Sequence, residues 1–168
     1  LVGPFRRYFK DLPNYSQSYY WEDVPVGDTK DGVPNHDLQA LDLPSDSVDL
    51  AITSDIFEHI RHPYRAFAEM HRVLRVGGSH VFTVPLQFPM PKKTVARVDT
   101  TTDEDVHLLP EVYHSAGEGG KSLVYTDFGE DMIARLDEIG FSTAISFIDR
   151  DRPLCAKNIT FVSTKTRA

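Results

Sequence analysis

The feature that most constrains this chain is a strand–helix–strand pattern at its centre, over residues 48–86. "VDLAITS" (Val48–Ser54) is a short apolar run between polar turns, which predicts a buried strand. "PYRAFAEMHRVLR" (Pro63–Arg75) has apolar residues at helical spacing, and Gly77–Gly78 follow it as a stop signal. "SHVFTVPL" (Ser79–Leu86) predicts a second strand. Because short links join the three elements, we expect a parallel strand pair with a right-handed crossover.

The C-terminal third predicts a helix and a hairpin. Thr126 is a candidate N-cap for the apolar stripe in "DFGEDMIARLDEIG", and Gly140 would end that helix. "STAISFI" (Ser142–Ile148) and "NITFVST" (Asn158–Thr164) alternate like two strands. The expected fold class is therefore α/β. We expect one domain over residues 1–168, with a mainly parallel sheet that ends in an antiparallel hairpin.

Residues 86–125 form a long stretch rich in Pro, Thr, Asp and Gly. We expect an insertion or lid over the carboxyl ends of the strands, where α/β proteins bind ligands. Its "HLLPEVYH" segment carries His107 and His114, seven residues apart. Two interpretations stay open: these side chains reach a binding pocket, or the segment only closes the edge of the sheet.

Composition narrows the class of function. A chain of 168 residues suffices for one domain with a core, and its net charge of −7 argues against general nucleic-acid binding. No apolar run approaches the roughly 18 residues of a membrane span. Cys155 is the single cysteine, so no internal disulfide forms, which fits a reducing cytoplasm.

The segment "HDLQALDLPSDSVDLAITSDIFEHIRHPYRAFAEMHRVLRVGGSHVFTVP", His36–Pro85, resembles the class I S-adenosylmethionine-dependent methyltransferases, in particular the type-11 group. The resemblance implies a Rossmann-like sheet, S-adenosylmethionine as cofactor and S-adenosylhomocysteine as product. It also implies methyl transfer to an oxygen or nitrogen of a small-molecule acceptor. The counterparts of the family's motifs are Asp37, Leu43–Pro44, Asp46–Asp49, Glu58–His59, Arg72–Leu74 and Gly77–Gly78.

The same resemblance implies cofactor contacts at two strand ends. Asp37 would accept a hydrogen bond from the adenine amino group, and the backbone N–H of Leu38 would bind a ring nitrogen. Ser54, Asp55 and Ile56 would flank the methionine part of the cofactor. Each site also has a simpler interpretation, because Asp37 can cap a turn and Ser54 or Asp55 can cap a short helix.

The first third departs from the family. Most members have a glycine-rich loop after the first strand, whereas only Gly3 of "LVGP" stands there, so the first strand is expected to be incomplete. Glu22 is the candidate substitute for the acid that usually binds the ribose. The chain begins with Leu1, which suggests a piece of a longer protein. These departures favour an alternative, a non-catalytic methyltransferase-like binding or interaction module. A nicotinamide-binding domain is disfavoured, since no G-x-G-x-x-G follows a strand.

Asp55, Glu58 and His59 have the spacing that places three side chains on one face of a helical turn. The set is similar to the E-x-x-E-H set of quinone-pathway O-methyltransferases, which can hold a divalent cation. Metal binding, a polar role beside the acceptor and a structural role all remain open, and we assign no metal ligand from sequence. His59, His107 and His114 are the candidate catalytic residues, because an imidazole titrates near neutral pH.

Overall fold

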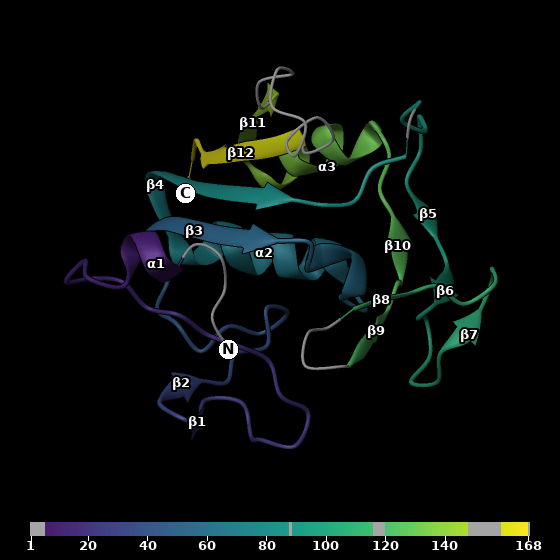
Figure 1. Cartoon of the computed structure of the whole chain (residues 1–168). Helices are drawn as coiled ribbons and strands as arrows, with labels where there is room; N and C mark the ends of the chain where they lie inside the picture. Colours follow the sequence, from purple (N-terminus) through teal and green to yellow (C-terminus); the bar gives the residue numbers. More distant parts are fainter. Residues whose placement is uncertain (1–5, 88, 116–119, 148–158, 168) are drawn as a thin grey trace.

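The computed structural model describes residues 6–87, 89–115, 120–147 and 159–167. At its centre is a four-stranded mixed sheet in the order β11–β12–β4–β3 (Figure 1). The strands of this sheet are β3 (Val48–Ser54), β4 (Leu74–Thr83), β11 (Phe141–Phe147) and β12 (Ile159–Lys165). The helices are α1 (Arg6–Phe9), the 3₁₀ turn η1 (Phe57–His59), α2 (Pro63–Val73) and α3 (Asp131–Ile139).

The strand directions confirm the expected C-terminal hairpin. β3 and β4 are parallel, while β12 is antiparallel to both β4 and β11. Three strands of the sheet therefore run in one direction, and β12 is the reversed one. β12 lies between β4 and β11, so β3 and β4 are the one pair of neighbouring strands in this sheet that is parallel. The expected mainly parallel sheet is therefore found in the direction of the strands, whereas most neighbouring strands pair antiparallel.

The central unit is confirmed as β3–α2–β4, with one difference at the end of the helix. β3 covers the predicted residues, but α2 ends at Val73 and Leu74 already has an extended backbone (φ −69°, ψ 141°). The two glycines lie inside β4 and do not cap the helix. A Cβ on Gly78 would lie 2.9 Å from the carbonyl oxygen of Arg75 and 3.0 Å from that of Asp49, so glycine permits the close approach of β3 and β4 here.

The start of α3 also differs from the prediction. Thr126 belongs to β10 (Thr126–Asp127), which pairs antiparallel with β5 (Val95–Ala96), so it is not an N-cap. The helix begins after Glu130 and, as predicted, ends at Gly140, whose φ is +118°. Strand pairing with the insertion therefore determines the conformation of Thr126 and outweighs its local preference for capping a helix.

The insertion after β4 consists of short paired strands. In Figure 1 it lies beyond the arrowheads of β3 and β4, at the carboxyl edge where it was expected. Its role as a lid remains a prediction. Besides β5, its strands are β6 (Val98–Asp99) paired with β7 (Val106–His107), and β8 (Tyr113–Ser115) paired with β9 (Lys121–Leu123).

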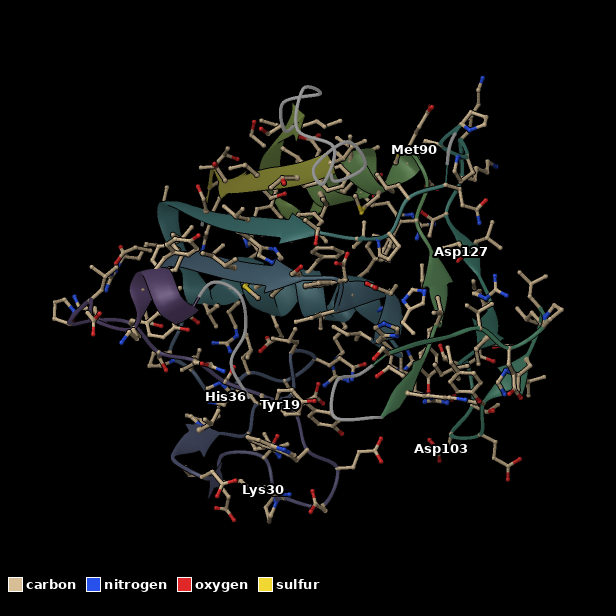
Figure 2. All side chains as sticks on the ribbon, in the orientation of Figure 1. Tyr19, Lys30, His36, Met90, Asp103 and Asp127 are labelled. Atoms are coloured by element: carbon tan, nitrogen blue, oxygen red, sulfur yellow. The ribbon has the colours of Figure 1, made fainter. Side chains whose placement is uncertain are left out.

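The N-terminal part is mostly irregular. β1 (Thr29–Lys30) and β2 (Val33–Pro34) form a small hairpin below β3 in Figure 1. Upstream of β1, Tyr19 makes an isolated parallel bridge with Asn35. Tyr19 and His36 lie between this hairpin and the main sheet (Figure 2), where the N–H of His36 donates to the carbonyl of Tyr19 at 2.9 Å. Gly3, the candidate glycine-loop residue, lies outside the described residues, as does Cys155.

One hydrophobic core lies between the sheet and the two longer helices. α2 and α3 contact each other and pack on the same face of the sheet, whereas Leu50 on the opposite face is 50% exposed. Within the described ranges, no helix combines the length and hydrophobicity that crossing a membrane requires. The largest core side chains are Phe57, Phe67, Phe82, Phe128, Phe141, Phe161, Leu74, Met132 and Leu136.

Arg72, near the end of α2, holds the loop that leads into β3. Its guanidinium donates to the carbonyl oxygens of Leu41 and Leu43 and to both carboxylate oxygens of Glu69, each at 2.8 Å. Glu69 in turn accepts the backbone N–H of Leu41 at 2.9 Å. This network fixes the chain between Asp37 and β3 against the helix.

His80, in the middle of β4, is fully buried among aromatic rings. Its Nε2 lies 2.9 Å from the hydroxyl of Thr53, and its ring stacks on Phe82 with centroids 4.7 Å apart. Burial lowers the pKa of His80 to about 3, so the imidazole is neutral in the folded protein.

We expect Arg72→Gln to lower the free energy of unfolding by about 2 kcal/mol, because several charge-assisted hydrogen bonds are lost and the carbonyls of the loop lose their donor. Arg75→Gln is the matched control. Its bond to Asp49 is exposed, so its loss should cost less than about 1 kcal/mol. Urea unfolding of the two variants measures both values, and equal losses would contradict the proposed role of Arg72.

Stability should depend on His80 below neutral pH. The folded pKa (about 3) lies below the ordinary value of 6.5, so the unfolded chain binds an extra proton, and stability is lost as pH falls from 6.5 towards 3. From pH 7 to pH 5 this amounts to about 2 kcal/mol. Urea unfolding of wild type and His80→Phe at both pH values should therefore show their difference change by about that amount. Parallel pH profiles would refute the assignment.

Candidate active site

The site is built at the edge where β3 and β4 end together. Ser54 and Thr83 are register partners, and their hydroxyl oxygens lie 3.1 Å apart. The next residue, Asp55, donates its backbone N–H to the carbonyl of Thr83 at 3.1 Å, and its Oδ1 accepts the Thr83 hydroxyl at 3.1 Å. The end of β4 therefore holds the loop after β3 in place.

The backbone of Asp55 turns sharply here. Its φ is +50°, a left-handed conformation that is uncommon for a non-glycine residue. η1 begins only at Phe57, so Asp55 does not share a helical face with Glu58 and His59. The predicted trio is wrong in this respect, because the carboxylate of Asp55 is turned onto Thr83.

Glu58 has the most unusual surroundings of any residue in the site. Its side chain is 2% exposed, and neither carboxylate oxygen has a hydrogen-bond partner among the described residues. Burial raises its pKa to about 7, and the negative charge of Asp55 acts in the same direction. The carboxyl group is therefore close to half protonated at neutral pH.

His59 is oriented by the insertion. Its Nδ1 lies 2.7 Å from the carbonyl oxygen of Leu123 in β9, and a carbonyl can only accept, so Nδ1 carries the proton. Nε2 then has the lone pair, and it lies 3.5 Å from Oε1 of Glu58. Burial lowers the pKa of His59, with a further contribution from His114, so the neutral imidazole is favoured.

His114 approaches the same carboxyl group from β8. Its Nδ1 lies 3.6 Å from Oε1 of Glu58, and its ring meets that of His59 edge-on with centroids 5.0 Å apart. His114 pairs with Ser122 in the β8–β9 hairpin, whose second strand also supplies Leu123. No sequence pattern predicts that His114 meets Glu58, since these residues are far apart along the chain.

His107 lies apart from this cluster. It is in β7 and its Nε2 lies 3.4 Å from Oε1 of Glu111. His107 and His114 are on different strands, and the "HLLPEVYH" segment is not a helix, so the spacing of seven does not bring them to one face. Of the three predicted histidines, the structure brings together His59 and His114.

Three polar residues that sequence patterns did not indicate tie the insertion to the sheet. Asp105 accepts hydrogen bonds from Nε of Arg61 and from the hydroxyl of Tyr125, both at 2.7 Å. The backbone N–H of Tyr125 donates to the carbonyl of Glu58 at 2.8 Å. Burial and Asp105 together raise the pKa of Tyr125 to about 12, so the phenol stays protonated and donates. Asp105 and Tyr125 lie in the insertion and Arg61 just before α2, so these contacts form only in the folded chain.

The expected cofactor residues lie on the loops before β3 and at its carboxyl end. Asp37 is half-buried and its Oδ1 accepts both the backbone N–H and the side-chain amide of Gln39, which is the predicted turn cap. Leu38 packs against the core, and Ile56 is 41% exposed. Glu22 is exposed. Asp37 and Glu22 both act electrostatically on Tyr20, whose pKa is raised first by burial and then by these charges.

A cleft of about 340 Å³ opens between the start of α2 and the insertion. Guanidinium and hydroxyl groups line much of it, which suits a ligand with negatively charged or hydrogen-bond-accepting groups. Asp127, labelled in Figure 2, lies just outside the lining on β10, where its carboxylate accepts a hydrogen bond from Arg97 at 2.7 Å. The lining residues are Arg61, His62, Pro63, Tyr64, Arg65, Thr94, Ala96, Val98, Thr100, Tyr125, Thr126 and Arg135.

Comparison with known families gives a match to a profile described as "Methyltransferase domain" over residues 27–82. The matched segment contains Asp37, β3, η1, α2 and most of β4. A curated relative is the malonyl-[acyl-carrier protein] O-methyltransferase of Paenibacillus sp., 32% identical over 112 residues, covering 64% of this chain and 35% of that protein. The chain thus spans about a third of that relative (35%).

Solved structures share the fold. One match is to a chain in the complex between the Haloferax volcanii Trm112 methyltransferase activator and a candidate methyltransferase (TM-score 0.53, 14% identity, 83% of this chain and 65% of that chain). Another is a candidate S-adenosylmethionine-dependent methyltransferase of Listeria monocytogenes (TM-score 0.50, 14% identity, 83% and 72%). At this identity the likeness shows the Rossmann-like fold alone. The domain match over residues 27–82 and the shared fold make this chain similar to the class I S-adenosylmethionine-dependent methyltransferases.

Proposed function

We propose that the protein transfers a methyl group from S-adenosylmethionine to an oxygen or nitrogen atom of a small-molecule acceptor. One observation carries the proposal. The two segments with cofactor-contact counterparts in the family, Asp37–Leu38 and Ser54–Ile56, flank β3 within the part of the chain that matches the methyltransferase domain. The polar groups of η1 and the insertion lie at the carboxyl end of the same strand, which is where ligands bind in this class of sheet.

The reaction does not require the protein to form a covalent bond with either substrate. The acceptor atom attacks the methyl carbon in line, the carbon–sulfur bond breaks, and its electron pair goes to sulfur, which leaves as a neutral thioether. The acceptor's proton is released to a base. Holding the three atoms in line therefore supplies much of the rate enhancement, with proton removal as a second contribution.

On the cofactor side, the proposal assigns the adenine amino group to Asp37 and a ring nitrogen to the N–H of Leu38. Oδ1 of Asp37 is engaged in the turn with Gln39, so Oδ2 is the atom assigned to the adenine. Ser54, Asp55 and Ile56 are assigned to the methionine part, and Glu22 to the ribose. Bonds from Asp55 to Thr83 support this assignment, because they hold the loop in one conformation.

On the acceptor side, the proposal assigns His59 and His114. His59 is the better base candidate of the two by orientation, since its Nδ1–H is fixed by Leu123 and its Nε2 lone pair is free to accept a proton. His107 keeps only an outer role, because it lies on β7 beside Glu111. The name of the curated relative, an O-methyltransferase, supports oxygen as the acceptor atom.

Binding of S-adenosylhomocysteine tests the cofactor side. We expect calorimetry to detect binding to the wild-type chain. Asp37→Asn should weaken it by about 1–3 kcal/mol, because an amide keeps the turn with Gln39 but loses the charge that the adenine amine would meet. Asp42→Asn removes the same charge from an exposed position nearby and should leave the affinity unchanged.

Two results would count against the proposal. Equal affinity of wild type and Asp37→Asn for S-adenosylhomocysteine would show that Asp37 does not bind the adenine. No heat at millimolar ligand, with folded protein, would favour the non-catalytic module.

The insertion is proposed to act as an acceptor-side lid held by Asp105. Asp105→Ala removes the partner of both Arg61 and Tyr125, so we expect limited proteolysis within residues 94–120 to be several-fold faster than in wild type. Asp103→Ala, at an exposed position two residues away (Figure 2), is the control and should be cleaved at the wild-type rate. S-adenosylhomocysteine with a bound acceptor should slow cleavage of wild type. Equal cleavage rates in all samples would show that the insertion is a fixed part of the structure and does not act as a lid.

A further inference from the structure

The buried carboxyl group of Glu58 lacks the partners that such a group normally has. Burying a carboxylate without hydrogen bonds is costly, and native proteins nearly always pair it. Both oxygens of Glu58 lack a hydrogen bond among the described residues, although the side chain is only 2% exposed. Two imidazoles approach this carboxyl group, with ring nitrogens 3.5 and 3.6 Å from Oε1, beyond good hydrogen-bond distance.

Three possible ligand atoms lie close together around this carboxyl group. One ligand atom each from Glu58, His59 and His114 can be chosen so that all three lie within 4.8 Å of one another. In a tetrahedral site with bonds of about 2.0–2.2 Å, ligand atoms lie roughly 3.4 Å apart. The two distances from Oε1 of Glu58, 3.5 and 3.6 Å, already have this length.

His59 has the second contact that metal-binding histidines usually have. A ligand imidazole nearly always donates its other N–H to a carboxylate, a carbonyl or water, which fixes the ring and the tautomer. Here Nδ1 donates to the carbonyl of Leu123 at 2.7 Å and leaves Nε2 towards Glu58. The orientation of this ring is therefore set by the backbone of β9.

From this geometry we propose that Glu58, His59 and His114 form a binding site for a divalent transition-metal ion of the zinc type. Two imidazoles and one carboxylate are the ligand set of an open zinc site, with room for a further ligand. A cation there would neutralise the buried carboxylate and give its Oε1 a partner. Asp55 is not a ligand, because its carboxylate is held by Thr83.

The site joins the insertion to the sheet. Glu58 and His59 belong to η1, whereas His114 comes from β8, so a bound ion would link the hairpin to the end of β3. If the proposed methyl transfer holds, the open position faces the acceptor side. The ion would then replace the histidine base by lowering the pKa of an acceptor hydroxyl.

Cobalt(II) titration of chelator-treated protein tests the site without any need for activity. We expect one equivalent of Co²⁺ to give the visible absorption of a four-coordinate N/O site, and Zn²⁺ to displace it. His114→Gln should weaken Zn²⁺ binding by about tenfold or more. His107→Gln is the matched control, because both side chains are 37% exposed on strands of the insertion, and it should bind like wild type.

Glu58→Gln should also abolish tight binding, and circular dichroism checks that this variant is folded. The absence of a one-to-one cobalt complex would overturn the proposal, as would equal affinities of wild type and His114→Gln. Calorimetry with S-adenosylhomocysteine on the chelator-treated protein tests methyl-donor binding separately. Its outcome does not depend on metal binding, so failure of one proposal is distinguishable from failure of the other.

Discussion

The parallel pairing of β3 with β4 is the constraint on which the rest of the structure depends. Two parallel neighbours need a crossover, and α2 provides it with its apolar stripe against the sheet. The pairing also brings both carboxyl ends to one edge, where Ser54 and Asp55 meet Thr83. Hydrogen bonds then hold the loops on both sides of β3. Arg72 holds the loop before the strand, and Thr83 holds the loop after it.

Glu58 is where the sheet and the insertion meet. Its backbone carbonyl accepts Tyr125, its neighbour His59 donates to Leu123, and its carboxyl group faces His114. A buried acid at such a junction makes docking of the hairpin sensitive to charge, since the low local dielectric strengthens every interaction made there. Burial destabilises the carboxylate of Glu58 when it is charged and unpaired. The same burial is tolerated when the group is protonated or when a cation binds beside it.

Local sequence patterns predicted most of the helices and strands. Where the structure differs from the prediction, contacts between residues far apart in the sequence are the cause. The limits of β3, the glycine end of α3 and the antiparallel hairpin followed from apolar alternation and from glycine. Thr126 was misassigned because pairing with Ala96 overrides its capping preference. At the site, Glu58 and His59 were predictable as a pair, but a left-handed Asp55 removed the expected third member. His114 takes that place through the fold of the insertion, which no spacing in the sequence encodes.

The strand order has a consequence for synthesis of the chain. Among the strands that the structure describes in this sheet, β12 is the last to be made, yet it lies between β4 and β11 and contributes Phe161 to the core. Until residues 159–165 have left the ribosome, β4 keeps an unpaired edge and β11 has no neighbour in the sheet. Earlier segments can therefore collapse only partially, with β4 exposed to pairing with other chains, and completion of the sheet waits for its final strand.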